Sequence, residues 1–122
     1  MKKMTEAQLS ELEQDLNAIR DEVIADLGER DARYIRRMIR LHRMLEAGGR
    51  VMMPFGFIPP VFVAATATLG VAKTLENMEI GHNVMHGQYD WMNDPALHSQ
   101  TYEWDTVCTG DSWRRTHNYE HH

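Results

Sequence analysis

Five of the seven histidines fall into two clusters whose spacing suits metal binding. The first cluster holds His82 and His86, and the second holds His117, His121 and His122. Residues four apart lie on the same face of a helix, so each such pair can direct two imidazoles toward one metal ion. His122 is rotated by about 100° from His121 around a helix, so the second cluster can direct nitrogens toward two points. The joint pattern favours a pair of metal ions.

Chance, solvation and helix capping account for only parts of this pattern. Two histidines four residues apart also arise by chance, and a solvated or capping role suits single histidines. Asn83 stands where the H-E-x-x-H metalloproteases have their general-base glutamate, so protease chemistry is unsupported. A purification tag does not fit His121 and His122, which follow ordinary polar residues. His42 and His98 have no partner at ligand spacing, and neither is predicted to be a ligand.

The first histidine cluster follows the most apolar stretch of the chain. No residue from 51 to 72 is charged, and Arg50 and Lys73 bracket the stretch. A helix of that length, at about 1.5 Å per residue, crosses a hydrocarbon layer of about 30 Å. Helix-breaking residues interrupt its first half, at Pro54, Gly56, Pro59 and Pro60. A continuous helix is predicted from about Val61 to Gly81. The alternative to a membrane segment is a buried core helix after a proline-rich loop.

Two more helices are predicted before the apolar stretch. Thr5 and Gln8 form a capping-box pattern that opens the first, and Gly28 ends it. Its apolar residues recur at alternating spacings of three and four, at Leu9, Leu12, Leu16, Ile19 and Val23. The second helix is predicted from Asp31 to the pair Gly48-Gly49. One side of it carries Tyr34, Ile35, Met38, Ile39, His42 and Leu45, and much of the rest carries Arg33, Arg36, Arg37, Arg40 and Arg43.

Composition and charge narrow the class of protein. The 122 residues suffice for one small domain, and the lone cysteine, Cys108, excludes an internal disulfide. The net charge of -5 is uneven, because residues 30–50 carry 7 arginines and 2 acids while the segments on either side are acidic. An acidic chain argues against general nucleic-acid binding. The basic helix fits an anionic membrane surface, and the alternative is a solvated arginine face on a helical hairpin.

Two membrane topologies are open at this point. The positive-inside rule places the arginine-rich segment before residue 51 in the cytoplasm. A single crossing would then place the histidine-rich part outside. A hairpin at residues 55–60 would instead return it to the cytoplasmic side.

The sequence around the histidines resembles a known family. Two histidine motifs carry the resemblance: H-x-x-x-H after an apolar span, and then H-x-x-x-H-H. They are similar to the first two histidine boxes of the membrane fatty acid desaturases. Residues 73–88, KTLENMEIGHNVMHGQ, and the following YDWMNDP resemble the actinobacterial acyl-CoA or acyl-lipid desaturases in particular. The resemblance covers about residues 49–122, with a weaker likeness in the N-terminal helices.

This resemblance implies an all-α, integral membrane fold in the cytoplasmic membrane, with the histidine boxes on the cytoplasmic face. It implies a di-iron centre whose ligands include His82, His86, His117, His121 and His122. It also implies O2 as co-substrate, a long-chain acyl-CoA or acyl lipid as substrate, and a ferredoxin-type carrier or a reductase as electron donor. Four polar residues are expected to hydrogen-bond the ligands, Glu76, Asn77, Glu79 and Asn83. The alternative is that they lie at the water interface.

The family pattern also contains a third box, [H/Q]-x-x-H-H, which does not occur before His122. We therefore expect residues 1–50 to form cytosolic or interfacial helices and residues 51–122 to form the N-terminal part of a desaturase domain. On this interpretation the 122 residues alone do not assemble a competent two-iron site. Two alternatives are a related histidine-box hydroxylase and a non-catalytic, membrane-associated metal-binding protein.

Overall fold

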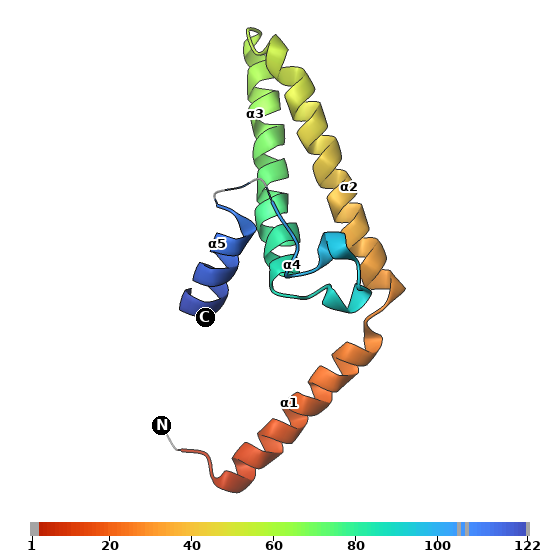
Figure 1. Ribbon diagram of the computed structural model, residues 1–122, viewed down its shortest axis with the longest axis vertical. Helices are drawn as coiled ribbons and strands as arrows, with labels where there is room; N and C mark the ends of the chain where they lie inside the picture. Colours follow the sequence, from red (N-terminus) through yellow and green to blue (C-terminus); the bar gives the residue numbers. More distant parts are fainter. Residues whose placement is uncertain (1–2, 105, 107, 122) are drawn as a thin grey trace. The chain divides into compact units, whose positions relative to one another are not determined.

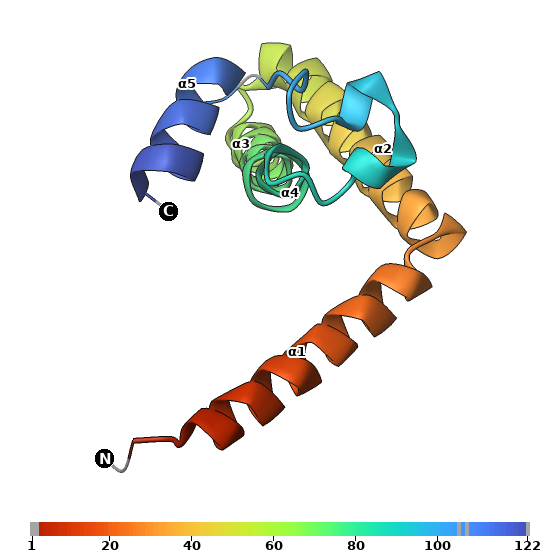
Figure 2. The same cartoon turned by 60° about the horizontal axis from the view of Figure 1, so that its bottom comes forward.

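The computed structural model describes residues 3–104, 106 and 108–121, and in this part of the chain it contains helices and no strand. The α-helices are α1 (Glu6–Asp26), α2 (Glu29–Met52), α3 (Pro59–Thr74), α4 (His82–Met85) and α5 (Gly110–Arg115) (Figures 1 and 2). Two π-helices, η2 (Leu75–Gly81) and η5 (Thr116–His121), and three short 3-10 turns complete the order. This confirms the all-α prediction. The chain forms two compact units, residues 1–31 and 32–122.

Helix α1 makes up most of the first unit. Its capping box is formed as predicted, because the Thr5 hydroxyl accepts from the Gln8 amide at 3.3 Å and the Gln8 side chain accepts from the Thr5 amide at 3.0 Å. The helix ends at Asp26, two residues before the predicted Gly28. None of its residues is buried.

Helix α2 differs from the prediction at both ends. Asp31 lies inside its first turn, where a carboxylate oxygen accepts from the Gly28 amide at 3.1 Å. The helix does not stop at Gly48-Gly49 and continues to Met52. A Cβ at Gly49 would lie 2.6 Å from Cγ of Leu69, so this glycine lets α2 and α3 approach closely. The prediction treated the glycine pair as a helix stop, whereas Gly49 serves interhelical packing.

The apolar stretch 51–72 is not one helix, as its helix-breaking residues predicted, and α3 begins at Pro59, two residues before the predicted Val61. The chain reverses direction between Met52 and Pro59, and α2 and α3 lie side by side as a hairpin (Figures 1 and 2). Pro54 lies in the short turn η1 (Met53–Phe55), and Pro59 and Pro60 occupy the first turn of α3, where no amide donor is required. Within the described ranges, no helix combines the length and apolar character needed to span a membrane.

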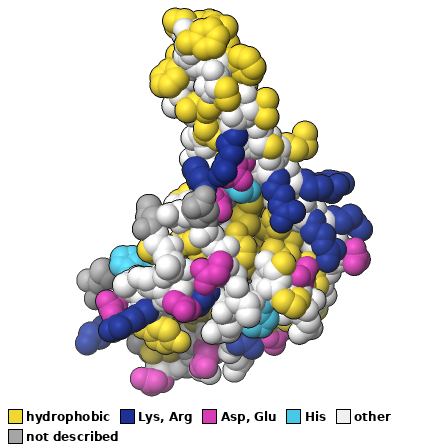
Figure 3. All heavy atoms as spheres, turned by 45° about the horizontal axis from the view of Figure 1, so that its top comes forward, with side chains coloured by type: hydrophobic (Ala, Val, Ile, Leu, Met, Phe, Trp, Pro, Cys, Tyr) yellow, Lys and Arg dark blue, Asp and Glu magenta, His cyan; other side chains and the backbone are white. Residues whose placement is uncertain are grey.

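The hairpin turn is covered with exposed apolar side chains. Phe57 is 80% exposed, and its exposed apolar neighbours are Val51, Met53, Phe55, Ile58, Phe62 and Val63. Figure 3 shows these hydrophobic side chains gathered at one end of the hairpin, with Lys and Arg side chains farther along it.

Helix α3 runs directly into η2 and α4, so the chain is helical from Pro59 to Met85. The predicted helix ended at Gly81. In the π-turn the amide of His82 donates to the carbonyl of Asn77, five residues back. The core of the second unit lies at the open end of the hairpin and is formed by Ile35, Ile80, Val84, Tyr89 and Leu97.

The segment after α4 folds back on itself through short turns. Gly87 has a φ of 79° and Asn93 a φ of 49°, both in the left-handed region that turns use. Asp90 closes this segment by accepting from the amide and the hydroxyl of Ser99, both at 2.7 Å. The chain then reaches α5, which begins after its N-cap Thr109.

Candidate metal centre

The first two candidate ligands face each other at the end of the long helical run. His82 begins α4, and His86 is its C-cap. Their Nε2 atoms are 3.1 Å apart. The predicted one-turn spacing therefore places two imidazole nitrogens at one point, on a helix whose preceding π-turn packs Ile80 into the core.

A third histidine comes from the second cluster. His117 lies in η5, and its ring centroid is 5.0 Å from that of His82 and 5.1 Å from that of His86. One ligand nitrogen from each of the three residues lies within 4.8 Å of the others. His86 is exposed and the other two are half-buried, so the group opens toward solvent on one side. The structure thus brings together residues from both clusters.

Of the remaining two predicted ligands, the structure describes only His121. The ring of His121 is 5.4 Å from that of His117, and His121 is not among the three residues with converging nitrogens. His122 lies outside the described residues. The prediction that five histidines bind two metal ions therefore stays a prediction.

The four predicted hydrogen-bonding residues have other contacts. The Nδ2 of Asn83 donates to the carbonyl of Glu79 at 2.8 Å, and that of Asn77 lies 3.6 Å from Sδ of Met78. The Glu79 carboxylate accepts from the Tyr34 hydroxyl, and this hydrogen bond raises the pKa of Tyr34.

Glu76 is the most buried of the four. Its carboxylate lies 2.9 Å from Nζ of Lys73 and 3.8 Å from Nε2 of His42. His42 was not predicted to have a special role, yet it is almost buried on α2 and faces this carboxylate. His42 and Glu76 line a cavity of about 470 Å³ together with Arg43 and Tyr102. Burial, followed by the charge of Glu76, raises the pKa of Tyr102 to about 12.

Trp113 packs against all three rings of the trio, although it was not among the predicted site residues. Its ring stacks on His117 at 4.2 Å and 25°, and it meets His82 and His86 edge-on at 5.4 and 5.5 Å. Trp104 in turn packs edge-on against Trp113 at 5.5 Å. The sequence spacing could have indicated this contact, because Trp113 precedes His117 by four residues and therefore lies on the same helix face.

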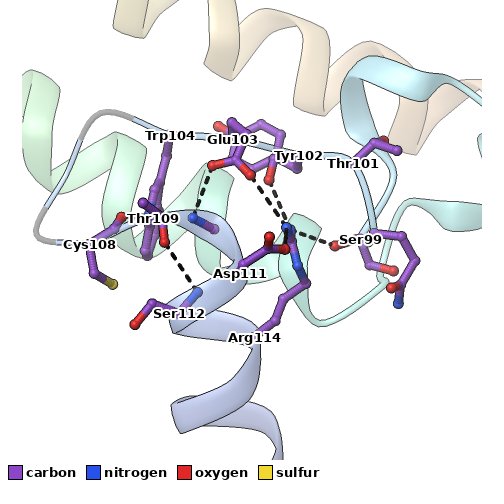
Figure 4. A network of polar contacts seen from close by, with 12 residues as sticks. Ser99, Thr101, Tyr102, Glu103, Trp104, Cys108, Thr109, Asp111, Ser112 and Arg114 are labelled. Carbon is purple, nitrogen blue, oxygen red and sulfur yellow. Dashed lines mark hydrogen bonds and ion pairs between the residues drawn. The ribbon is translucent and has the colours of Figure 1, made fainter.

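Asn118 and Arg114 hold the second histidine cluster in place. Asn118 donates from Nδ2 to the carbonyl of Met85 at 3.3 Å, which ties η5 to α4. Arg114 donates to the carbonyls of Ser99 at 3.1 Å and Tyr102 at 3.0 Å, and it pairs with Asp111 at 2.6 Å (Figure 4). The Asn118 contact thus joins the segment that carries His117 to α4, and the Arg114 contacts anchor α5 to the preceding loop.

The donor set determines which metals fit. Three neutral imidazoles suit iron, zinc, copper or nickel, and they disfavour magnesium or calcium, which take oxygen ligands. The trio leaves coordination positions for further ligands, a feature of catalytic rather than structural sites. His82, His86 and His117 therefore fit a transition metal.

Comparison with known proteins identifies curated relatives of this chain. The chain is 52% identical over 119 residues to the NADPH-dependent stearoyl-CoA 9-desaturase of Mycobacterium tuberculosis, in strains CDC 1551 and H37Rv. This chain is related to a stearoyl-CoA desaturase. The match covers 98% of the chain and 28% of the desaturase, so the chain spans under a third of the length of the curated relatives it matches.

The comparison supports the predicted relationship to a desaturase and does not favour the hydroxylase or the non-catalytic alternative, whereas the histidine boxes stay a prediction. The aligned part includes nearly all of this chain, the N-terminal helices among it. No protein-family model matches the chain. No solved structure matches it either.

Proposed function

We propose that this chain contributes part of the metal centre of an acyl-CoA desaturase in a membrane. The observation that carries the proposal is the convergence of His82, His86 and His117 in a chain that is 52% identical to a stearoyl-CoA 9-desaturase. The reaction takes a saturated acyl chain, O2, two electrons and two protons, and it yields one carbon–carbon double bond and two water molecules. NADPH is the proposed ultimate source of the electrons, delivered through a ferredoxin-type carrier or a reductase.

Iron is the proposed metal, and a di-iron centre is the proposed form. His82, His86 and His117 would bind it, with His121 and His122 as further ligands. When bound, iron supplies the redox chemistry that reduces O2 and removes hydrogen from two adjacent methylenes. The chain's own residues hold the imidazoles in place, Trp113 by stacking on His117 and Asn118 by tying η5 to Met85.

The proposed location is the cytoplasmic membrane, with the hairpin turn inserted in the lipid. Three observations support this. The exposed side chains at the turn, such as Phe57, are apolar. Arginines follow along α2, where they can pair with anionic headgroups. The hairpin also returns the chain to the end from which α2 starts (Figure 1), so the histidines lie on the arginine-rich side, which is cytoplasmic by the positive-inside rule.

A metal-binding experiment tests the site. The chain is purified in mild detergent without added metal, loaded with Fe²⁺ under anaerobic conditions, and analysed for bound iron and for quenching of tryptophan fluorescence. We expect iron binding that falls in His82→Ala and His117→Ala and persists in His98→Asn. His98 is a matched control, because it is a half-exposed histidine outside both clusters. Equal iron binding in all variants would contradict the proposal that His82 and His117 bind the metal.

A segment exchange tests the desaturase function itself. The aligned segment of the mycobacterial stearoyl-CoA 9-desaturase is replaced by this chain, and NADPH-dependent conversion of stearoyl-CoA is measured. We expect the exchanged protein to retain desaturation and its His86→Ala variant to lose it. A folded exchange that binds iron but produces no unsaturated product would contradict the proposed function and leave the metal site standing.

A further inference from the structure

Helix α1 carries an exposed apolar seam. The seam consists of five side chains, Leu9, Leu12, Leu16, Ile19 and Val23, and each is between 43% and 59% exposed. The helix has no buried residue, although its capping box is complete. Contiguous exposed apolar side chains on a well-formed helix mark a contact surface.

The spacing of the seam identifies the kind of contact. Steps of three and four residues alternate, which is the 3.5-residue period of a coiled coil. Leu9, Leu16 and Val23 take the a positions, and Leu12 and Ile19 take the d positions. The helix also carries 7 acidic side chains against one arginine, so an anionic lipid surface would repel it. The seam therefore fits a second helix.

We propose that α1 pairs in parallel with α1 of a second copy of this chain. In a parallel pair, each g residue faces the e residue five positions later on the other helix. Asp15, at g, then faces Arg20 of the partner subunit, at e, and symmetry gives this attractive pair twice. Of the other g residues, Gln8 faces the partner subunit's Glu13, and the position opposite Glu22 falls at residue 27, beyond the end of α1, so no like charges meet.

The antiparallel arrangement is less favourable. It places g residues against g residues, so Asp15 would face Glu22 of the partner subunit with like charge. The parallel pair instead requires Arg20 to leave its contact with Asp21, at 3.0 Å. Both side chains of that contact are about two-thirds exposed, so the exchange costs little. The inference goes beyond the proposed function and does not depend on it.

Disulfide trapping in the full chain tests the pairing. Cys108 is first replaced by Ser, and a single cysteine is then placed at Leu12→Cys, in the seam, or at Gln14→Cys, on the opposite face. Equivalent d residues face each other only in a parallel pair, so oxidation in mild detergent should link Leu12→Cys several-fold more than Gln14→Cys. Arg20→Glu should lower the yield at position 12, and Asp15→Lys combined with Arg20→Glu should restore it.

Two results would overturn the proposal. Equal linking at positions 12 and 14 would indicate unspecific association, for instance through the apolar hairpin turn. Linking at position 12 that does not respond to Arg20→Glu would remove the charge argument for the parallel pair. These α1 residues are all exposed, so the substitutions remove no buried side chain from the helix.

Discussion

At the residue scale, Gly81 is required by the indole ring beside it. A Cβ at this position would lie 2.4 Å from the nearest ring carbon of Trp104 and 3.0 Å from the carbonyl of Glu76. Trp104 cannot easily move, because its Nε1 donates to the carbonyl of Cys108 at 2.8 Å and its ring packs on Trp113. The glycine thus lets the helix that carries His82 lie against the aromatic side of the histidine trio.

Substitution of this glycine should therefore destabilise the protein. We expect Gly81→Ala to lower the free energy of unfolding by about 1–3 kcal/mol, the usual range for overpacking. The matched control is Gly70→Ala in α3, where nothing lies within 4 Å, and it should raise stability by up to about 1 kcal/mol. Urea unfolding followed by circular dichroism measures both. A Gly81→Ala protein as stable as Gly70→Ala would disprove the close approach.

Tyr102 provides a prediction about pH. Burial and the charge of Glu76 raise its pKa to about 12, against a weaker lowering by Arg43. The unfolded value is about 10, so this tyrosine contributes stability that is fully present below pH 10 and is lost as the pH rises toward 12. An ultraviolet titration of phenolate absorbance should show a late step near pH 12. Tyr102→Phe should remove that step, and Tyr119→Phe should leave it.

Residue types and spacing predicted the first half of the histidine trio, because residues one helical turn apart, such as His82 and His86, lie on the same face of a helix. The approach of His117 could not be derived from residue types. It depends on the path of the chain between residues 86 and 110, where Asp90 binds Ser99 and Arg114 binds two carbonyls. These contacts join residues 9 to 15 positions apart, and no local pattern encodes them.

At the element scale, Arg114 ties α5 to the loop before it. Arg114 is 12% exposed and donates to the carbonyls of Ser99 and Tyr102, whereas the adjacent Arg115 is 81% exposed and meets Glu120 at 3.4 Å. A guanidinium presents several donors in a fixed plane, so it can satisfy both carbonyls at once.

Removal of Arg114 should therefore uncouple α5 from the loop. We expect Arg114→Leu to cost about 2–4 kcal/mol of stability, since it leaves partly buried carbonyls without a donor. Arg115→Leu should cost no more than about 0.5 kcal/mol, as for an exposed ion pair. Thermal unfolding measures both. If the metal site is formed as proposed, Arg114→Leu should also weaken Fe²⁺-induced quenching of tryptophan fluorescence. Equal stability of the two variants would contradict this role.

Element types were predictable where local chemistry decides them. The capping box of α1 and the proline start of α3 follow from residues next to each other in the chain. The end of α2 was mispredicted, because Gly49 does not end the helix. It leaves room for the side chain of Leu69, twenty residues away, which packs against α2 at this point. The π-turns at residues 75–81 and 116–121 were also missed. Such turns depend on packing, and they are frequent at functional sites.

At the scale of the whole molecule, charge and apolar surface are segregated along the chain. Residues 1–29 carry 3 basic and 8 acidic side chains, residues 30–50 carry 7 arginines and 2 acids, and the next charged residue after Arg50 is Lys73. In the second unit this order places the exposed apolar turn beyond the arginines of α2 (Figure 3). Apolar insertion and attraction to anionic headgroups would therefore act together at one end of that unit.

This arrangement predicts how the chain binds lipid vesicles. Phe57 and Tyr119 are matched in exposure, at 80% and 82%, but only Phe57 lies at the hairpin turn. Withdrawing one phenylalanine from lipid costs about 1.5–3 kcal/mol, so Phe57→Ser should weaken binding by at least about tenfold, and Tyr119→Ser should not. Co-sedimentation with vesicles containing phosphatidylglycerol should also exceed that with phosphatidylcholine alone, and salt should reduce the difference because it screens the arginines. Equal loss in the two serine variants would place the lipid contact elsewhere on the chain.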